Sequence, residues 1–164
     1  MISTRKWLIT LGTIAAGLLF FVTMVHAEQP YDITNCWSGE SKVLFASKEL
    51  VVMGYELKGI ARDNLETKSF DNMSFQCVGI SKIVAGKTSG NSYCKFMDLD
   101  GDYTVGETTS SGAEGTWKFL HGTGKWNGVT GGGKMMYITK SKPIQEGTFQ
   151  NCNRATGTYE LPKQ

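Results

Sequence analysis

Short apolar runs separated by glycine-rich breaks are the feature that most constrains how this chain can fold. Beyond the first 27 residues the sequence holds 18 of its 20 glycines and all three prolines. No window there repeats its apolar residues with a helical period. Runs rich in Val, Ile, Phe and Tyr, interrupted this often by turn residues, are typical of short β-strands. The sequence therefore predicts an all-β protein.

Residues 115–134 show this pattern at its densest. A strand over residues 116–120 is followed by a break at 121–124, a compact turn that carries Trp126, and a second break at 131–133. Glycine accepts positive φ and lets a second backbone approach closely, so glycines beside large aromatic residues predict a tightly folded connection. We expect this turn to plug or brace one end of the domain, with Trp126 as its anchor.

The first 27 residues have the organisation of a secretory signal peptide. Arg5 and Lys6 form a positive start, residues 8–25 are apolar and uncharged, and Val25 and Ala27 suit the −3 and −1 positions of a cleavage site. A membrane anchor is the alternative, because the apolar run approaches the ~18 residues of a spanning helix. We predict cleavage after Ala27, a periplasmic or secreted protein, and no stable membrane anchor after cleavage.

Cleavage would leave a chain without net charge. Two of the 17 basic residues, Arg5 and Lys6, lie in the signal, whereas all 15 acidic residues lie in residues 28–164. No basic cluster remains, so charge gives no support for nucleic-acid binding. Residues 28–164 suit one domain that buries its own core.

The four cysteines, Cys36, Cys77, Cys94 and Cys152, all lie beyond the signal. An even number in an exported chain favours two disulfides, for which three pairings exist, and no spacing resembles a Cys-x-x-Cys redox or zinc motif. Cys77 and Cys94 lie almost symmetrically about a break at Ala85 and Gly86, as cross-strand partners in a hairpin would. We therefore prefer Cys77 with Cys94. Cys36 with Cys152 would then join the first strand to the last.

The strand-like runs are residues 42–46, 50–61, 70–84 (one strand or a pair), 93–99, 102–109, 116–120, 135–140, 147–150 and 157–161, with a polar connection at 62–68 and a loop at 87–91. We take these runs to indicate roughly eight strands. Asp100 and Gly101 suit a type I′ hairpin turn. That turn would place Phe96 opposite Val105 and Cys94 opposite Glu107. Strands at this spacing favour a closed antiparallel barrel, which has no exposed edge.

Three segments carry a resemblance to a known group of proteins. Residues 93–102 (YCKFMDLDGD), 115–119 (GTWKF) and 122–131 (GTGKWNGVTG) resemble bacterial exported proteins of the allene oxide cyclase-like group, which is related in fold to plant dirigent proteins. The resemblance implies a calycin-like barrel whose lumen accepts a small apolar molecule. It does not imply the cyclase reaction, because that family's catalytic residues have no matching positions in this sequence.

Asp98, Asp100 and Asp102, with Glu107 further on, have the alternating oxygen ligands of a calcium loop. A calcium loop that starts at Asp98 would need glycine at its sixth position and glutamate at its twelfth, where this chain has Tyr103 and Thr109. We therefore expect solvated carboxylates at a hairpin tip. Calcium at Asp98, Asp100 and Asp102 is a weak alternative, and no other cofactor is indicated.

His121 is the histidine that would remain after cleavage, because His26 belongs to the signal. No serine or cysteine nucleophile accompanies it in a recognisable motif, so we expect a turn residue and not a general base. The segment 122–125 (GTGK) lacks the full spacing of a phosphate-binding loop and does not open a helix.

Aromatic residues at alternating strand positions are the remaining candidates for a functional site. They are Trp37, Tyr55, Phe75, Phe96, Trp117, Phe119, Trp126, Tyr137 and Phe149. An eight-stranded barrel has room inside for a packed core or for one small ligand. Our candidates for a lumen or turn site are Tyr55, Phe75, Phe96, Trp117, Phe119, Trp126 and Tyr137. Glu56, Lys58 and Glu107 would take part in acid–base chemistry only if they faced inward.

Three functions of different class follow from these observations. The sequence favours a barrel that binds a small apolar or aromatic molecule in its lumen. A structural or interaction barrel with a filled core, which could form a homo-oligomer, is the close alternative. An isomerase or cyclase-type enzyme is supported least, since it would need an inward carboxylate or histidine beside a cavity.

Overall fold

A computed structural model describes residues 27–139 and 141–162. Except for Ala27, the predicted signal peptide lies outside the described residues. No helix in the described ranges is long and apolar enough to cross a bilayer.

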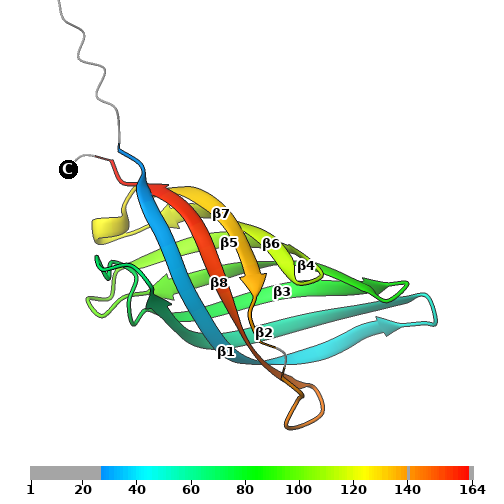
Figure 1. Cartoon of the computed structure of the whole chain (residues 1–164). Coiled ribbons are helices and arrows are strands. Elements are labelled where there is room, and N and C mark those ends of the chain that lie inside the picture. Colours follow the sequence, from blue (N-terminus) through cyan, green and yellow to red (C-terminus); the bar gives the residue numbers. More distant parts are fainter. Residues whose placement is uncertain (1–26, 140, 163–164) are drawn as a thin grey trace, which may run out of the picture.

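Eight antiparallel strands form a closed barrel, in which each strand pairs with its neighbours in the sequence and β8 returns to β1 (Figure 1). The strands are β1 (Gln29–Ala46), β2 (Leu50–Asp63), β3 (Ser74–Val84), β4 (Lys87–Met97), β5 (Tyr103–Ser111), β6 (Glu114–Gly122), β7 (Thr130–Tyr137) and β8 (Thr148–Glu160), with a 3-10 turn η1 (Gly124–Trp126) before β7. The predicted all-β barrel is confirmed.

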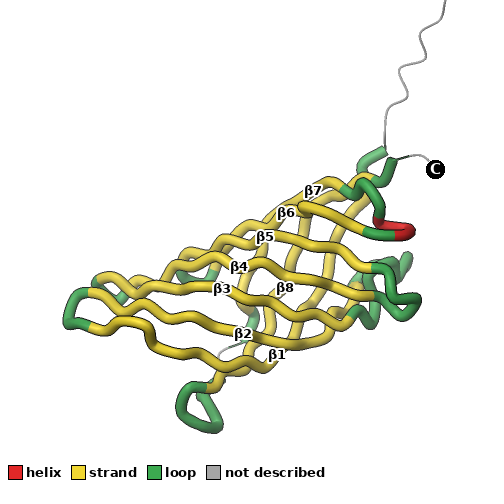
Figure 2. Tube along the Cα trace, turned by 180° about the vertical axis from the view of Figure 1, so that it is seen from behind, coloured by secondary structure: helices red, strands yellow, loops and turns green. Residues whose placement is uncertain are grey.

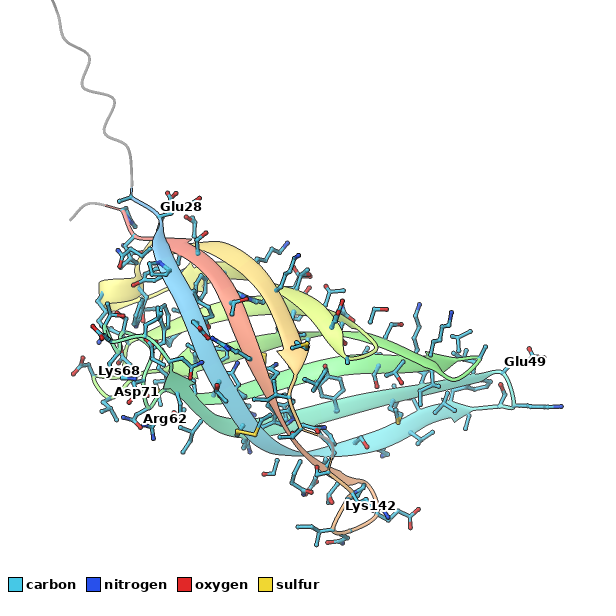
Figure 3. All side chains as sticks on the ribbon, in the orientation of Figure 1. Glu28, Glu49, Arg62, Lys68, Asp71 and Lys142 are labelled. Atoms are coloured by element: carbon cyan, nitrogen blue, oxygen red, sulfur yellow. A yellow bond between two sulfur atoms is a disulfide. The ribbon has the colours of Figure 1, made fainter. Side chains whose placement is uncertain are left out.

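The barrel has two different ends. One holds the β1–β2, β3–β4 and β5–β6 hairpin turns, and the first two of these hairpins project furthest (Figure 2). Glu49 marks the tip of the β1–β2 hairpin, and Arg62, Lys68 and Asp71 lie at the opposite end (Figure 3). β1 begins and β8 ends at that opposite end, where Gln29 pairs with Tyr159.

The end where β1 begins and β8 ends is closed by a packed aromatic core. The segment between β2 and β3 folds inward because the carboxylate of Asp63 accepts hydrogen bonds from the backbone N–H of Leu65 (2.8 Å) and of Phe70 (3.0 Å). The Phe70 ring lies 4.7 Å from the ring of Tyr31 and 4.6 Å from that of Trp126. Residues 70–73 were predicted to begin a strand, but they lie before β3, which starts at Ser74, and the buried side chains of Phe70 and Met73 fill this end of the barrel.

Other predicted strand boundaries are also wrong. The first strand begins at Gln29 and not at residue 42, and the expected break at 131–133 belongs to β7. Residues 87–91, expected as a loop, belong to β4, and the two short strands expected over 147–161 form the single strand β8. The inward residues of β4 here are small, such as Gly90 and Ser92, so this part of the strand lacks the alternating apolar pattern that marks a strand in sequence.

The β4–β5 hairpin has a wider turn than predicted. Met97 pairs with Tyr103, which leaves five residues, 98–102, in the connection. The Asp98 carboxylate accepts hydrogen bonds from the backbone N–H of Asp100 (2.9 Å) and of Asp102 (3.0 Å), so a side chain builds the turn.

The wider turn shifts the hairpin register by one residue. Phe96 faces Thr104 instead of Val105, and Cys94 faces Gly106 instead of Glu107. This shift also decides which residues of β5 point inward, because successive side chains of a strand lie on opposite faces.

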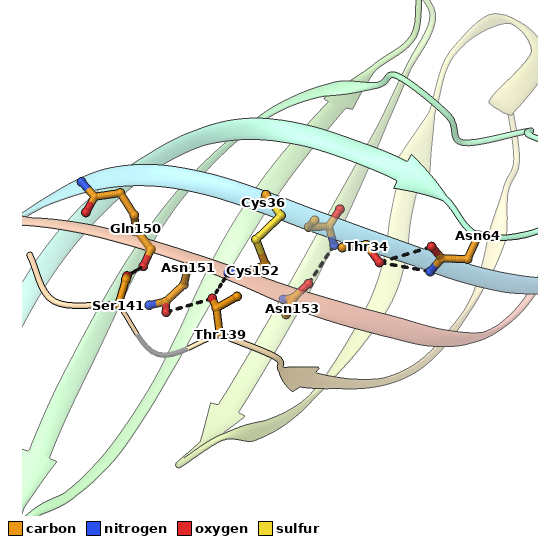
Figure 4. The surroundings of a disulfide bond; sticks show 10 residues. Thr34, Cys36, Asn64, Thr139, Ser141, Gln150, Asn151, Cys152 and Asn153 are labelled. Carbon is orange, nitrogen blue, oxygen red and sulfur yellow. Dashed lines mark hydrogen bonds between the residues drawn. A yellow bond between two sulfur atoms is a disulfide. The ribbon is translucent and has the colours of Figure 1, made fainter.

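Cys36 pairs with Cys152 and Cys77 with Cys94, the pairing that the sequence favoured. In each bridge the two cysteines are direct cross-strand partners, with Cα atoms 4.1 Å and 4.0 Å apart. The first bridge joins β1 to β8 on the outer surface, where Cys36 is exposed (Figure 4). The second joins β3 to β4 inside the barrel, where both cysteines are buried.

Candidate ligand-binding cavity

A cavity of about 930 Å³ occupies the barrel from its middle to the hairpin end. All eight strands contribute to its wall, and the turn residues Gly86 and Gly112 border its mouth. Its volume falls within the ~300–1,000 Å³ that is usual for small-molecule sites. The barrel therefore combines a filled end with a hollow end, where the sequence had left the choice between the two open.

The hairpin end of the barrel is hollow because fewer and smaller side chains point inward there than at the closed end. At the closed end, Phe70 and Trp126 enter the barrel from connecting segments and add to the side chains of the strands. The β1–β2, β3–β4 and β5–β6 turns at the mouth are short, and the described residues of the longer β7–β8 connection contribute only the small side chains of Thr139 and Ser141 to the cavity. Several cavity-lining positions toward the mouth, including Ser92 and Ser110, are also small.

Six of the seven predicted aromatic site residues line this cavity. They are Tyr55, Phe75, Phe96, Trp117, Phe119 and Tyr137, and Trp37 and Phe149 of the wider aromatic set join them. The Trp37 ring lies 5.8 Å from that of Tyr137, and the Tyr55 ring lies 6.1 Å from that of Phe149. Edge-on contacts of this kind hold the rings in place in the cavity wall.

Trp126, the seventh predicted residue, lies outside the cavity. It is buried at the closed end, where its ring stacks on Phe70 and its indole nitrogen donates a 2.9 Å hydrogen bond to Asp98 Oδ2. Its contacts are those of an anchor for the turn after β6.

The three aspartates of the candidate calcium loop contact Lys125 in this structure. Lys125 Nζ lies 2.9 Å from Asp98 Oδ2 and 2.9 Å from Asp100 Oδ2, and the Lys125 backbone N–H donates to Asp102 Oδ2 at 3.1 Å. Within residues 27–139 and 141–162, no group of three or more His, Cys, Asp or Glu side chains is arranged to hold a metal ion. These carboxylates fasten η1 to the β4–β5 hairpin.

The charge state of this cluster follows from its contacts. Burial by itself raises the pKa of Asp98, but hydrogen bonds from Lys125 and Trp126 and the charge of Lys125 outweigh it, so the pKa of Asp98 is lowered. Hydrogen bonds to Asp100 and Asp98 raise the pKa of Lys125. Both partners are therefore charged at neutral pH.

The charged candidates for acid–base chemistry do not point into the lumen. Glu56 and Lys58 are exposed and form an ion pair of 3.2 Å with each other. Glu107 borders the cavity but directs its carboxylate to Lys118 Nζ, 2.9 Å away on a side chain that is 61% exposed. His121 is exposed at the end of β6.

The polar groups inside the cavity are uncharged. Burial, and then the neighbouring Tyr55, raise the pKa of Tyr137, so its hydroxyl stays protonated at neutral pH. Asn35 donates a 3.0 Å hydrogen bond to Asn153 Oδ1 across β1 and β8. Asn35 Oδ1 and Trp37 Nε1 are buried and have no hydrogen-bond partner among the described residues.

Sequence reasoning missed the polar residues of the lumen. Asn35, Asn153, Ser92 and Thr108 all line the cavity, and Ser92 Oγ lies 2.7 Å from Thr108 Oγ1. Asn, Ser and Thr are common in turns and on outer faces, so their type carries no sign of an inward position. Counting alternate residues from an inward aromatic on the same strand, such as Trp37 or Phe96, would have found all of them except Thr108, whose strand has no inward aromatic.

Comparison with known proteins supports the fold alone. No protein-family model matches the sequence, and no curated protein matches it. Among solved structures, the chain is similar to the pterocarpan synthase dirigent protein GePTS1, with a TM-score of 0.52 and 9% sequence identity over 93% of this chain and 100% of that chain. The barrel is therefore dirigent-like in fold.

Proposed function

We propose that this protein is an exported barrel that binds one small, uncharged apolar or aromatic molecule in its lumen. The observation that carries the proposal is a cavity of about 930 Å³, lined by aromatic side chains and open at one end of a barrel whose other end is packed. Such a cavity removes apolar ligand surface from water, which is the main driving force for binding.

Two observations support export. The first 27 residues have the features of a signal peptide. Two disulfides hold the barrel, and bonds of this kind persist in oxidising compartments such as the periplasm or the outside of the cell.

Catalysis has less support than binding. Glu56 and Glu107 form ion pairs with exposed lysines and His121 is exposed, so none of these three acid–base candidates is directed at the hydroxyls of the lumen. The synthase activity in the name of GePTS1 belongs to that protein, and an identity of 9% carries only the fold.

The tryptophan indole groups provide the test of lumen binding. The full chain is expressed with its own leader, and the exported protein is titrated with 2,7-dimethylnaphthalene while the indole N–H signals are followed by nitrogen-15 NMR. We expect the signal of Trp37, in the cavity wall, to shift, and that of Trp126, at the closed end, to stay in place. Equal shifts of both signals, or none, would contradict the proposal.

A matched pair of variants sharpens this test. Thr108 points into the lumen, whereas its neighbour Thr109 is exposed on the outer face of β5. Thr108→Phe should fill the cavity and weaken binding by at least tenfold, and Thr109→Phe should leave the affinity unchanged. Mass spectrometry of the same preparation reports whether cleavage follows Ala27.

A second role, as an interaction barrel that forms a homo-oligomer, is favoured by a different observation. Val78 and Tyr93 are direct partners on the outer faces of β3 and β4, with Ile80 beside them, and these side chains are 50–53% exposed. Adjacent exposed apolar side chains are typical of contact surfaces. Native mass spectrometry distinguishes a monomer from an oligomer, and Val78→Lys should dissociate an oligomer that uses this face.

A further inference from the structure

The cavity wall on β4 and β5 differs in character from the rest of the lumen. Between Phe96 and the mouth, each inward position of these two strands carries glycine, serine or threonine. These residues are Thr88, Gly90, Ser92, Gly106, Thr108 and Ser110. The one inward position of this stretch that differs is Cys94, which forms the buried disulfide. We call these six residues the hydroxyl wall.

Large aromatic side chains stand opposite the hydroxyl wall. In a closed barrel of eight strands, β4 and β5 face β8 and β1 across the lumen. β1 and β8 contribute Trp37 and Phe149 to the cavity, and the flanking strands β2 and β7 contribute Tyr55 and Tyr137. The lumen therefore carries large aromatic side chains opposite the small hydroxyls, together with the amides of Asn35 and Asn153 on β1 and β8.

The hydroxyl wall keeps hydrogen-bonding capacity for a ligand. Ser92 and Thr108 are direct cross-strand partners, and their oxygens lie 2.7 Å apart. A hydroxyl has one proton and two lone pairs, so a bond between two hydroxyls uses one of their two protons and one lone pair. Ser92 Oγ also lies 3.8 Å from Cys94 Sγ, which is a weak partner at most.

The hydroxyls are spaced along the barrel axis. Alternate residues of a strand share a face and lie about 7 Å apart, so the wall extends about 14 Å from Ser92 to Thr88. Ser110 lies between these levels on β5, where its partner on β4 is Gly90. One flat molecule that lies along the wall would meet hydroxyls at more than one level.

The six residues of the hydroxyl wall are uncharged, so a charged ligand would find no ion-pair partner among them. Among the described residues, the charged side chains that border the cavity are Lys87, which is exposed at the mouth, and the pair Glu107 and Lys118. A charged group drawn into the lumen would lose its hydration without gaining an ion pair. The wall therefore favours uncharged hydrogen-bonding groups.

We infer that the ligand is a flat, uncharged molecule with hydroxyl groups along one edge, and this inference rests on the proposed lumen binding. Its ring face packs against Trp37, Tyr55, Tyr137 and Phe149. Its hydroxyl edge lies on the β4–β5 wall, where Ser92, Thr108 and Ser110 exchange hydrogen bonds with it. The hydroxyl wall thus determines both the orientation of the ligand and the preference for hydroxylated over plain hydrocarbon rings.

Two isosteric probes test the inference. Naphthalene-2,7-diol carries two hydroxyls on one edge, and 2,7-dimethylnaphthalene carries methyl groups of similar size at the same positions. Both are titrated against the exported protein and against Ser92→Ala/Thr108→Val, which removes both members of the hydroxyl pair with little change of volume. Thr109→Val, on the outer face of the same strand, is the matched control.

The expected result is a loss confined to one probe. The double variant should bind the diol about five- to tenfold more weakly, which is the range for one or two lost hydrogen bonds, and should bind the dimethyl compound as tightly as before or more tightly. Thr109→Val should bind both probes unchanged. Replacing both partners of a buried hydrogen bond by apolar groups is close to neutral for stability, so the double variant should fold. A thermal melt checks that the double variant folds. If it does not, the same titrations are made with the single variant Thr108→Val.

Two different failures are distinguishable. If the dimethyl compound binds and shifts the Trp37 indole signal, but the diol affinity of the double variant stays within twofold of the original, lumen binding stands and the assignment of the hydroxyl wall is wrong. If neither probe binds the unmodified protein, the proposed function fails, and this inference fails with it.

Discussion

The indole nitrogen of Trp126 donates a 2.9 Å hydrogen bond to Oδ2 of Asp98, and this bond fastens the turn after β6 to the β4–β5 hairpin. Lys125 Nζ reaches the same oxygen at 2.9 Å. The acidic hairpin and the glycine-rich turn, which suggested separate roles in the sequence, form one structural unit. That unit and Phe70 together close one end of the barrel.

Asp98→Asn should destabilise the protein at neutral pH, by about 1–3 kcal/mol, because it removes the charge from a carboxylate that is 6% exposed and hydrogen-bonded. The pKa of Asp98 is lower in the folded than in the unfolded protein. Its stabilisation is therefore present above the unfolded pKa of about 4 and is lost as pH falls through the lowered folded pKa. Urea unfolding measures the free energy of unfolding of both proteins at pH 7 and at pH 3. The difference in this free energy between Asp98→Asn and the original protein should be smaller at pH 3. If the difference in free energy of unfolding were the same at both pH values, the ionised carboxylate of Asp98 would not be the source of the stabilisation.

Trp126→Ala should destabilise the barrel by about 3–5 kcal/mol, since it opens a cavity beside Phe70 and removes the hydrogen bond to Asp98. Leu99→Ala is the control in the same hairpin, because Leu99 is 85% exposed, and it should change stability by less than about 0.5 kcal/mol. Denaturant unfolding measures both. If Trp126→Ala kept full stability but abolished binding of 2,7-dimethylnaphthalene, the turn would be the binding site instead of a structural anchor.

Gly133→Ala should also be strongly destabilising, by about 2 kcal/mol or more, because a Cβ atom there would lie 1.9 Å from the Thr156 carbonyl oxygen and 2.7 Å from the Gly157 Cα. Gly54 offers the opposite case, since a Cβ at Gly54 meets nothing within 4 Å. Gly54→Ala should leave stability unchanged or raise it by a few tenths of a kcal/mol, as loss of backbone freedom in the unfolded chain favours folding. Thermal melts of the two variants compare them directly, and equal losses would show that the β7–β8 contact is looser than described.

The two disulfides should differ in their reaction with a small thiol. Cys36 is exposed on the outer surface, whereas Cys77 and Cys94 are each 4% exposed inside the barrel. Because thiol exchange requires access to a sulfur atom, dithiothreitol should open Cys36–Cys152 first. Alkylation at timed intervals followed by peptide mapping should label Cys36 and Cys152 before Cys77 and Cys94. The reverse order would mean that reductant reaches the lumen more readily than the outer bridge.

The barrel and its disulfide pairing could be predicted because they depend on local signals. Alternating apolar residues mark the strands. Ala85 and Gly86, which both have positive φ, form the hairpin turn that places Cys77 opposite Cys94. The role of Phe70 could not be predicted, since it depends on hydrogen bonds to Asp63 that draw a loop into the barrel. The register of the β4–β5 hairpin was wrong for a similar reason: the Asp98 side chain, and not a backbone turn preference, sets the turn.

The candidate site was predicted in part for the same reasons. Aromatic residues are conspicuous in a sequence, so the aromatic side of the lumen could be proposed before the fold was known. Predicting the hydroxyl wall requires the register of β4 and β5. Thr108 and Thr109 are the same residue type, and only the register shows that Thr108 points into the lumen and Thr109 points outward.

The first and last strands of the barrel begin and end beside Gln29 and Tyr159, away from the cavity mouth. Anything tethered at either end of the described barrel, whether an affinity tag, a fluorescent fusion or a solid support, therefore sits behind the packed end and leaves the entrance unobstructed. The protein can be immobilised by its amino or its carboxyl end in the same orientation, with its mouth presented to the flowing solution.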